Sequence, residues 1–344
     1  MILPFPSSLP AFQRAFPDDA ACRAHLLSLR SGETFRCPRC GHGKAWALRS
    51  RGLLTCASCR RQVSVTSGGA LDHARLPLSL VFLATYLVAT TPGLNAVTLA
   101  RQLGIARHGT AWLLLSKLRR AMTTALTEPL SGMVEADEAW FGGPQDAEKR
   151  RKWGRSALLV LALAEARPKG RARLVRISDN RASTLVRVIS EHVAAGSTIR
   201  TDGWRAYESL ARHGYAHDRR PRAPGWAKRG ERATPYADEA ISAAKRWLIA
   251  TYNKPPRAHL PTYLAEFAFR REFRDPATAF ETILRVLMSA PPTPRRRIAH
   301  AADLPAILVA PPRGRPQPEK MSGTKMKPAM SARKRARQPA HAIV

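Results

Sequence analysis

Four cysteines near the N-terminus constrain the fold of this chain more than any other feature. They form two pairs, Cys37 with Cys40 and Cys56 with Cys59, with two residues inside each pair and fifteen between the pairs. This C-x2-C-x15-C-x2-C spacing is typical of a four-thiolate zinc site, in which two tight turns bring the sulfurs to tetrahedral positions. The sequence therefore predicts a structural zinc ribbon. The fifth cysteine, Cys22, lies in a helical pattern and is expected to be a packed small residue.

Other uses of paired cysteines fit this chain less well. Disulfides are typical of secreted domains, and the first residues, Met1–Pro4, lack the charged and apolar regions of a secretory signal. A redox site would need one C-x-x-C pair rather than two. No apolar run approaches the roughly 18 residues of a membrane span. We therefore expect a cytoplasmic, reducing environment and no membrane partner.

The chain is strongly basic, with 57 Lys plus Arg against 25 Asp plus Glu and a formal net charge of +32. Such a charge favours polyanionic partners and salt-sensitive association with nucleic acid. Ribosomal and membrane-surface proteins are also basic, so charge alone does not choose among these classes.

Three regions are predicted before residue 126: a helical lead-in over 1–34, the zinc ribbon over 35–70 and a helical region over 71–125. The lead-in is expected to hold one helix with Asp18 or Asp19 at its N-cap. In the helical region, the apolar run 78–90 predicts a buried helix. Helices over 95–103 and 108–122, joined at a glycine, are typical of a DNA-binding helix-turn-helix. An ordinary helical hairpin is the alternative.

From residue 130 the pattern changes to that of an α/β domain. The predicted elements are strands over 133–141, 157–166 and 172–178, a helix over 183–194, a strand over 198–200, and helices over 238–251 and 260–274. This order favours an α/β core of the ribonuclease-H type over 130–285. Residues 212–234 are interpreted as a basic loop that either contacts DNA or merely connects. Residues 286–344 have the composition of a disordered basic tail.

Acidic residues are scarce, and a few fall where they can converge. Asp137 lies within the first strand of this core, Asp202 just past its last strand, and Asp238 and Glu239 open the next helix. Each acid alone would be read as a surface carboxylate. Together they suit two Mg²⁺ or Mn²⁺ ions roughly 4 Å apart, which can activate the attacking oxygen and stabilise the leaving oxygen of a phosphodiester.

Asp137 is flanked by two further acids, Glu135 and Glu138. We expect alternation along the strand to place both on the face opposite Asp137, so that one face serves the metals. Asp137 is therefore the chosen ligand, a choice that also rests on a family resemblance.

That resemblance is carried by several stretches. In the first half they are Phe16-Pro17, Cys22, Phe35–Gly41, Cys56–Cys59, Val63–Gly68, Leu99–Gly104 and Thr110–Trp112. In the second half they are Val134–Glu138 with Gly142-Gly143, Thr201–Trp204 with Tyr207, Lys245-Arg246 and Leu260–Arg270. Over residues 11–275 the chain resembles bacterial insertion-sequence transposases with a zinc-ribbon head and a DDE-type, ribonuclease-H-like integrase core. The resemblance implies that Asp137 and Asp202 are the first two metal ligands.

The third motif departs from the family, which has a His-x-Asn pair followed three residues later by Glu. Counted back from Lys245, these positions are Ala233, Pro235 and Asp238. Glu239 would replace Asp238 as a ligand only if the helix rotated by about 100°. Lys245, two helical turns beyond Asp238, is expected to share its groove and to contact the phosphate backbone.

We therefore predict an insertion-sequence DNA transposase. The ribbon and helix-turn-helix would bind the terminal repeats of the element, and the core would cut and join strands, with further copies of the chain assembled on nucleoid DNA. The expected cofactors are structural Zn²⁺ and catalytic Mg²⁺ or Mn²⁺. Because the third motif is altered, the alternative is a catalytically inactive, transposase-derived DNA-binding protein. A zinc-ribbon regulator or an RNA binder of ribosomal type is a third possibility.

Overall fold

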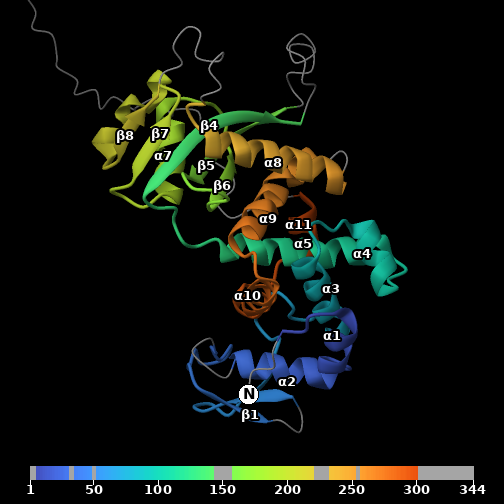
Figure 1. Ribbon diagram of the computed structural model, residues 1–344. Helices are drawn as coiled ribbons and strands as arrows, with labels where there is room; N and C mark the ends of the chain where they lie inside the picture. The colour runs from blue at the N-terminus through green and yellow to red at the C-terminus, as the bar shows by residue number, and fades with distance from the viewer. Residues whose placement is uncertain are drawn as a thin grey trace, which may run out of the picture. The chain divides into compact units, whose positions relative to one another are not determined.

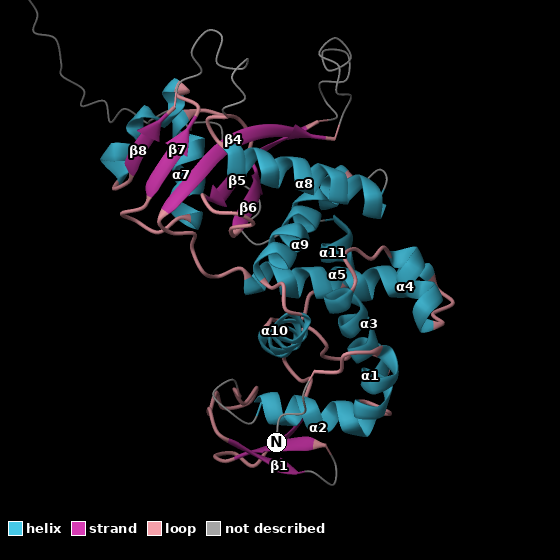
Figure 2. Ribbon diagram, viewed as in Figure 1, coloured by secondary structure: helices cyan, strands magenta, loops and turns pink. Residues whose placement is uncertain are grey.

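The described parts of the chain build three hydrophobic cores: one beneath the N-terminal helices and one on each face of a five-stranded sheet (Figures 1 and 2). The computed structural model describes residues 5–30, 35–48, 52–142, 157–220, 232–252 and 256–300. Three predictions fall on other residues and lie outside this description: Gly143, most of the basic loop (221–231) and the tail beyond residue 300. No helix within the described ranges is long and apolar enough to cross a membrane.

Two helices precede the ribbon, where the sequence predicted one: α1 (Leu9–Ala15) and α2 (Asp19–Arg30). Asp18 caps α2, since its Oδ1 accepts from a backbone N–H of the first turn at 2.8 Å. Asp19 has a different role. Its carboxylate accepts from the N–H and the hydroxyl of Ser79, at 2.9 and 2.8 Å, and so ties α2 to the first turn of α3 (Leu78–Thr90).

The ribbon is a three-stranded antiparallel sheet in the order β1-β2-β3. Its strands are β1 (Ala45–Leu48), β2 (Leu53–Cys56) and β3 (Gln62–Ser64). The stretches 45–48 and 62–65 predict short strands, which correspond to β1 and β3, whereas β2, which ends in a cysteine of the zinc site, was missed.

Helices α3, α4 (Ala96–Leu103) and α5 (His108–Ala125) line the first core together with α1, α2 and α10 (Pro276–Ser289), and α11 (Arg295–His300) packs against α5. The first three lie close to their predicted positions. The prediction of a disordered tail from residue 286 was wrong up to residue 300. Leu287, Met288 and Ile298 are buried, because α10 packs against α2, α3 and α5, and α11 packs against α5.

The central sheet has the strand order β6-β5-β4-β7-β8. Its strands are β4 (Met133–Phe141), β5 (Leu158–Glu165), β6 (Ala172–Arg176), β7 (Thr198–Thr201) and β8 (Ala216–Arg219). β4, β5 and β6 pair antiparallel, whereas β7 pairs parallel with both β4 and β8. A mixed α/β core was predicted correctly. β8 was not, since it lies in the segment interpreted as a basic loop and is only four residues long.

Helices cover both faces of this sheet (Figure 1). On one face lie α7 (Ala182–His192) and the 3₁₀ segment η2 (Arg205–His213). On the other lie α8 (Pro235–Tyr252) and α9 (Leu260–Glu272), the latter preceded by η4 (Arg257–His259). The two faces of β4 follow from alternation: Val134 and Ala136 pack toward α7, and Ala139 and Phe141 toward α8.

A buried ion pair joins the helical part to the second half of the chain. Arg119 of α5 donates from Nε to Glu266 Oε2 of α9 at 2.7 Å, and the Tyr252 hydroxyl at the end of α8 donates to the same oxygen at 2.9 Å. Arg270 holds the other carboxylate oxygen at 2.8 Å. Burial raises the pKa of Glu266, but the two arginines outweigh it and hold that pKa below its usual value.

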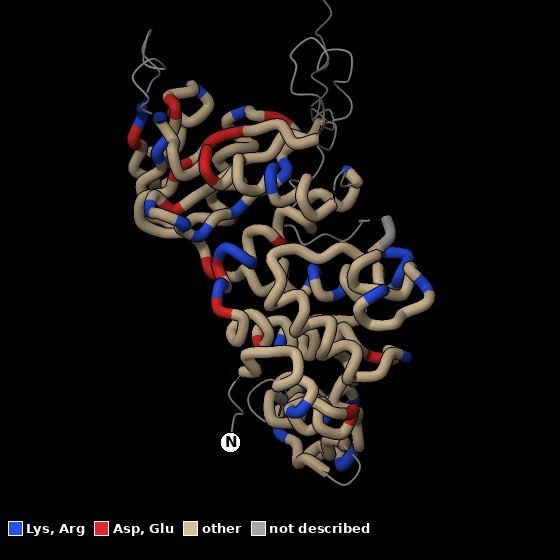
Figure 3. Tube along the Cα trace, turned by 45° about the vertical axis from the view of Figure 1, so that its right-hand side comes forward, with Lys and Arg blue, Asp and Glu red and all other residues tan. Residues whose placement is uncertain are grey.

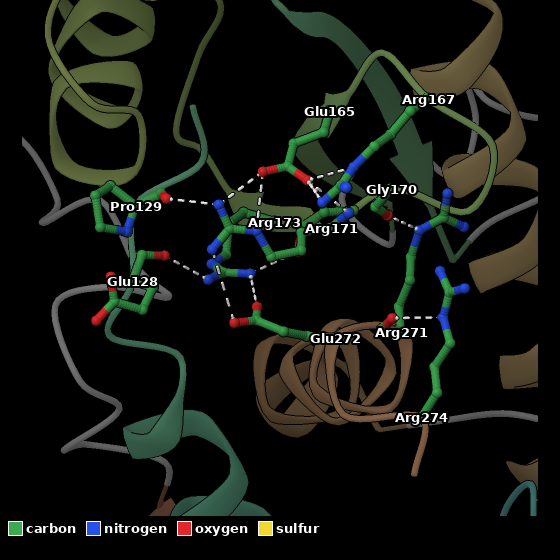
Figure 4. Close-up of polar contacts among 11 residues, drawn as sticks. Glu128, Pro129, Glu165, Arg167, Gly170, Arg171, Arg173, Arg271, Glu272 and Arg274 are labelled. Atoms are coloured by element: carbon green, nitrogen blue, oxygen red, sulfur yellow. Dashed lines mark hydrogen bonds and ion pairs between the residues drawn. The ribbon is translucent and has the colours of Figure 1, made fainter. Parts of the chain in front are cut away.

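A second ion-pair cluster lies at the β5–β6 turn, the end of α9 and the segment before β4 (Figure 4). Glu165 at the end of β5 pairs with Arg167 and Arg171, each at 2.7 Å. Arg173 of β6 pairs with Glu272 of α9 at 2.7 Å and donates to the backbone just before β4. These contacts attach one end of the sheet to α9.

We predict that Glu266→Ala lowers the free energy of unfolding by about 3–5 kcal/mol, because it leaves two arginines, one of them fully buried, without their counter-charge. Denaturant unfolding followed by circular dichroism measures this change. Glu281→Ala is the matched control, since Glu281 pairs on the surface of α10 with Arg285 at 3.4 Å. That change is expected to cost under about 1 kcal/mol. Equal effects of the two substitutions would contradict the role given to Glu266.

Candidate functional site

The four ribbon cysteines meet, as their spacing predicted. Their sulfurs all lie within 4.8 Å of one another, and Cys37–Cys59 and Cys40–Cys56 are each 3.6 Å apart. A disulfide would need about 2.05 Å. Four thiolates at about 2.3 Å from a tetrahedral zinc ion would lie roughly 3.8 Å apart. The cluster therefore fits a structural zinc ion and excludes disulfides between these pairs.

The two cysteine turns are built alike. The residue after the second cysteine of each pair, Gly41 in one turn and Arg60 in the other, has a left-handed backbone with φ of 70° and 56°. Its N–H donates to the carbonyl of the first cysteine, at 2.9 Å to Cys37 and 3.1 Å to Cys56. Both turns thus present their sulfurs to a common centre. Cys22 is fully buried and lies outside the cluster, as expected.

Two of the predicted acids stand side by side on neighbouring strands. β4 and β7 pair in parallel with Glu135 opposite Arg200. Two residues further on, Asp137 of β4 and Asp202, just past the end of β7, fall at the same level of the sheet. Both are half-buried. Both carboxylates also act on one neighbour, since their charges raise the pKa of Glu138.

Glu138 lies on the face of β4 opposite Asp137, as expected from alternation. The hydroxyl of Tyr207, a residue of η2, donates to its Oε1 at 2.8 Å. Burial, and then the charges of Asp137 and Asp202, raise the pKa of Glu138 to about 7 despite this hydrogen bond. Tyr207 therefore connects the segment after Asp202 to the strand of Asp137. Nothing in the sequence pointed to this contact, although Tyr207 belongs to the second family motif.

The expectation for the other flanking acid was wrong. Glu135 precedes Asp137 by two residues, and a period of two places both on the same face. Its Oε2 accepts from the backbone N–H groups of Tyr236 and Ala237, at 2.6 and 3.1 Å, in the first turn of α8. Its side chain is fully buried.

Helix α8 carries the candidates for the third acid. It begins at Pro235 rather than at Asp238, so Asp238 is its fourth residue. Asp238 lies 3.8 Å from Arg232, whereas Glu239 forms an ion pair of 2.6 Å with Arg271 of α9. Glu239 is thus held by another helix, and Asp238 has the looser of the two ion pairs.

Lys245 lies near the other end of β4. Its Nζ is 5.3 Å from the centre of the Phe141 ring. Lys245 follows Asp238 by seven positions, close to two helical turns, so the two occupy one face of α8. Among the residues described, the cysteines are the one group of three or more potential ligands within 4.8 Å of one another. Asp137, Asp202 and Asp238 thus do not form so tight a group.

Two family models match the chain. One, a transposase zinc-ribbon domain, matches residues 17–62; the other, an ISXO2-like transposase domain, matches residues 129–272. The chain carries both domains of an insertion-sequence transposase. The transposase domain extends from the segment before β4 to the end of α9 and so includes Asp137, Asp202 and Asp238. No curated protein and no solved structure matches the chain significantly.

We predict that the purified chain holds about one zinc ion and that Cys56→Ser loses it, because three thiolates no longer close a tetrahedral site. Atomic emission on dialysed protein measures the zinc content. Cys22→Ala is the matched control, since this cysteine is equally buried but outside the cluster. Zinc retained in Cys56→Ser, or lost in Cys22→Ala, would contradict the assignment.

Proposed function

We propose that this chain is a DNA transposase that cleaves and joins DNA strands with two Mg²⁺ or Mn²⁺ ions held by Asp137, Asp202 and Asp238. The observation that carries this proposal is the parallel register of β4 and β7, which sets Asp137 and Asp202 abreast within a transposase domain. Two ions between such carboxylates would activate the attacking oxygen and stabilise the leaving oxygen at phosphorus.

The proposed fold of this domain is ribonuclease-H-like. Three antiparallel strands followed by two parallel ones, with helices on both faces of the sheet, support it. In this arrangement the first strand is central and the fourth is its parallel neighbour. The two strands that carry Asp137 and Asp202 are therefore adjacent, although 64 residues separate the acids in sequence.

Asp238 is the proposed third ligand. It lies in the first turn of a helix whose N-terminus is hydrogen-bonded to Glu135, two residues before Asp137 on β4. Glu239 is already paired with Arg271. Lys245 lies on the same helix face as Asp238 and would contact a phosphate of the DNA next to the cut.

DNA binding is proposed for the N-terminal region, with α4 and α5 as a helix-turn-helix. Nine of the 18 residues of α5 are buried, whereas His108 in its first turn is exposed, as are Arg101 of α4 and Arg107. Recognition helices contact bases with their N-terminal residues, so this burial suits the motif. Figure 3 shows the acidic residues concentrated on the sheet part, which leaves the helical part predominantly basic. The ligand would be the terminal repeats of the element, with several copies assembled on nucleoid DNA.

The proposal predicts that Asp137→Asn and Asp202→Asn each reduce Mg²⁺-dependent cleavage by roughly 100-fold or more, since a metal ion contributes several kcal/mol to the transition state. The substrate is a duplex carrying the terminal repeats that flank the coding sequence, and cleavage is measured on denaturing gels. Glu208→Gln is the control. This exposed acid lies on η2, soon after Asp202, and pairs loosely with Arg219 at 3.7 Å.

The same assay tests the third ligand and the alternative function. Asp238→Asn is expected to lose activity, and Glu239→Gln to keep it. Asp238→Glu, which restores the longer side chain of the family, is expected to cleave at least as well as the natural chain. Cleavage that survives Asp137→Asn would overturn the site. If the natural chain binds the repeats but never cleaves them, it is the inactive DNA-binding protein instead.

A further inference from the structure

Glu135 is not a proposed metal ligand, yet its carboxylate contacts two of the elements that surround the candidate site. Its carboxylate is completely buried. Oε2 accepts from two N–H groups at the start of α8, at 2.6 Å from Tyr236 and 3.1 Å from Ala237. Oε1 lies 3.5 Å from Nη1 of Arg200 on β7. One buried carboxylate on β4 therefore holds a helix and a neighbouring strand together.

Each of these contacts lies next to one of the three acids of the proposed site. Glu135 precedes Asp137 by two residues, and Arg200 precedes Asp202 by two. The strand register places Glu135 directly opposite Arg200. Ala237, whose N–H Glu135 accepts, immediately precedes Asp238. The three elements that carry or precede the acids are thus joined within two residues of each acid.

Glu135 also caps the N-terminus of α8, a role that usually belongs to the side chain of the N-cap residue. Thr234 occupies the N-cap position of α8, because its carbonyl accepts the first helical hydrogen bond from Asp238 at 3.0 Å. Threonine usually caps through its hydroxyl, yet within the described residues this buried hydroxyl has no hydrogen-bond partner. The N-terminal N–H groups of α8 are instead satisfied by a carboxylate from β4, whose negative charge also suits this end of the helix.

We propose that Glu135 is the positioning residue of the metal site: it fixes the separation of Asp137, Asp202 and Asp238 without binding the ions itself. This inference rests on the proposed function. The geometry gives the reason, since a rotation of α8 or a slide of β7 would move an acid away from Asp137 and would at the same time break a contact to Glu135. Displacements of about 1 Å are enough to lower catalysis roughly 100-fold.

The test uses full-length Glu135→Gln. Glutamine keeps the size of the side chain but has one acceptor oxygen, so it cannot accept from α8 and face Arg200 with a charged oxygen at once. We expect Mn²⁺ binding, followed by electron paramagnetic resonance, to weaken about 10–100-fold, as for other residues that orient metal ligands. The Mn²⁺ concentration for half-maximal cleavage should rise in parallel. Zinc content and affinity for the terminal-repeat duplex should stay unchanged, which a general loss of structure would not allow.

Glu165→Gln is the matched control. Glu165 is another buried carboxylate that accepts from a backbone N–H and pairs with arginine, but its partners, Arg167 and Arg171, lie at the β5–β6 turn (Figure 4). It should lower stability without changing the Mn²⁺ dependence. Arg200→Gln is the second variant, used if Glu135→Gln fails to fold; Arg200 is partly exposed, and its loss should weaken Mn²⁺ binding in the same direction.

The outcomes separate this inference from the function on which it rests. If Glu135→Gln depends on Mn²⁺ as the natural chain does, the positioning role is overturned. Arg200→Gln replaces it in this test if Glu135→Gln does not fold. In either case the proposed function stands as long as Asp137→Asn abolishes cleavage. A shift of the Mn²⁺ dependence in Glu165→Gln equal to that in Glu135→Gln overturns it as well. Cleavage that survives Asp137→Asn overturns the proposed function instead.

Discussion

The parallel pairing of β4 with β7 is the constraint on which the candidate site depends. β4 pairs antiparallel with β5 along its length but meets β7 over only three residue pairs, at Met133, Val134 and Glu135. β7 then ends, and the chain turns away at Asp202. An acid at the end of one strand is thereby held beside an acid in the middle of another. A shift of one residue in this register would turn Asp202 to the other side of the sheet.

The few acids of this basic chain divide into two groups by burial. Glu135, Glu165 and Glu266 are buried, and each faces at least one arginine. Two of them join elements that are distant in sequence: Glu266 joins α9 to α5, and Glu135 joins β4 to α8 and β7. Asp137 and Asp202, by contrast, are only half-buried. Structural acids thus hold the elements together, whereas the acids proposed to bind metal ions are only partly buried.

Local patterns predicted much of the fold. The cysteine spacing identified the zinc site, and alternating or continuous apolar runs located β4, β5 and α3 through α5. Elements whose position depends on distant partners were missed. β8 is recognisable only by its pairing with β7, and α10 follows the predicted core in sequence but packs into the N-terminal helices. Such partners cannot be read from a single segment.

The site was predicted in part for the same reason. Asp137 and Asp202 followed from strand patterns and a family resemblance, and the structure places them at one level of the sheet. The role of Glu135 was missed, because alternation was misapplied and because its partners on α8 follow about a hundred residues later. The sequence already favoured Asp238 over Glu239 as the third ligand, and the ion pair of Glu239 with Arg271 agrees with that choice.

The most direct test of the two-metal site is a crystal of the full-length chain grown or soaked with Mn²⁺ and measured at the manganese absorption edge. The account predicts anomalous peaks about 4 Å apart, bounded by Asp137 and Asp202 with Asp238 on the third side. A well-ordered sheet with no manganese at Asp137 and Asp202, at concentrations that support cleavage, would contradict it.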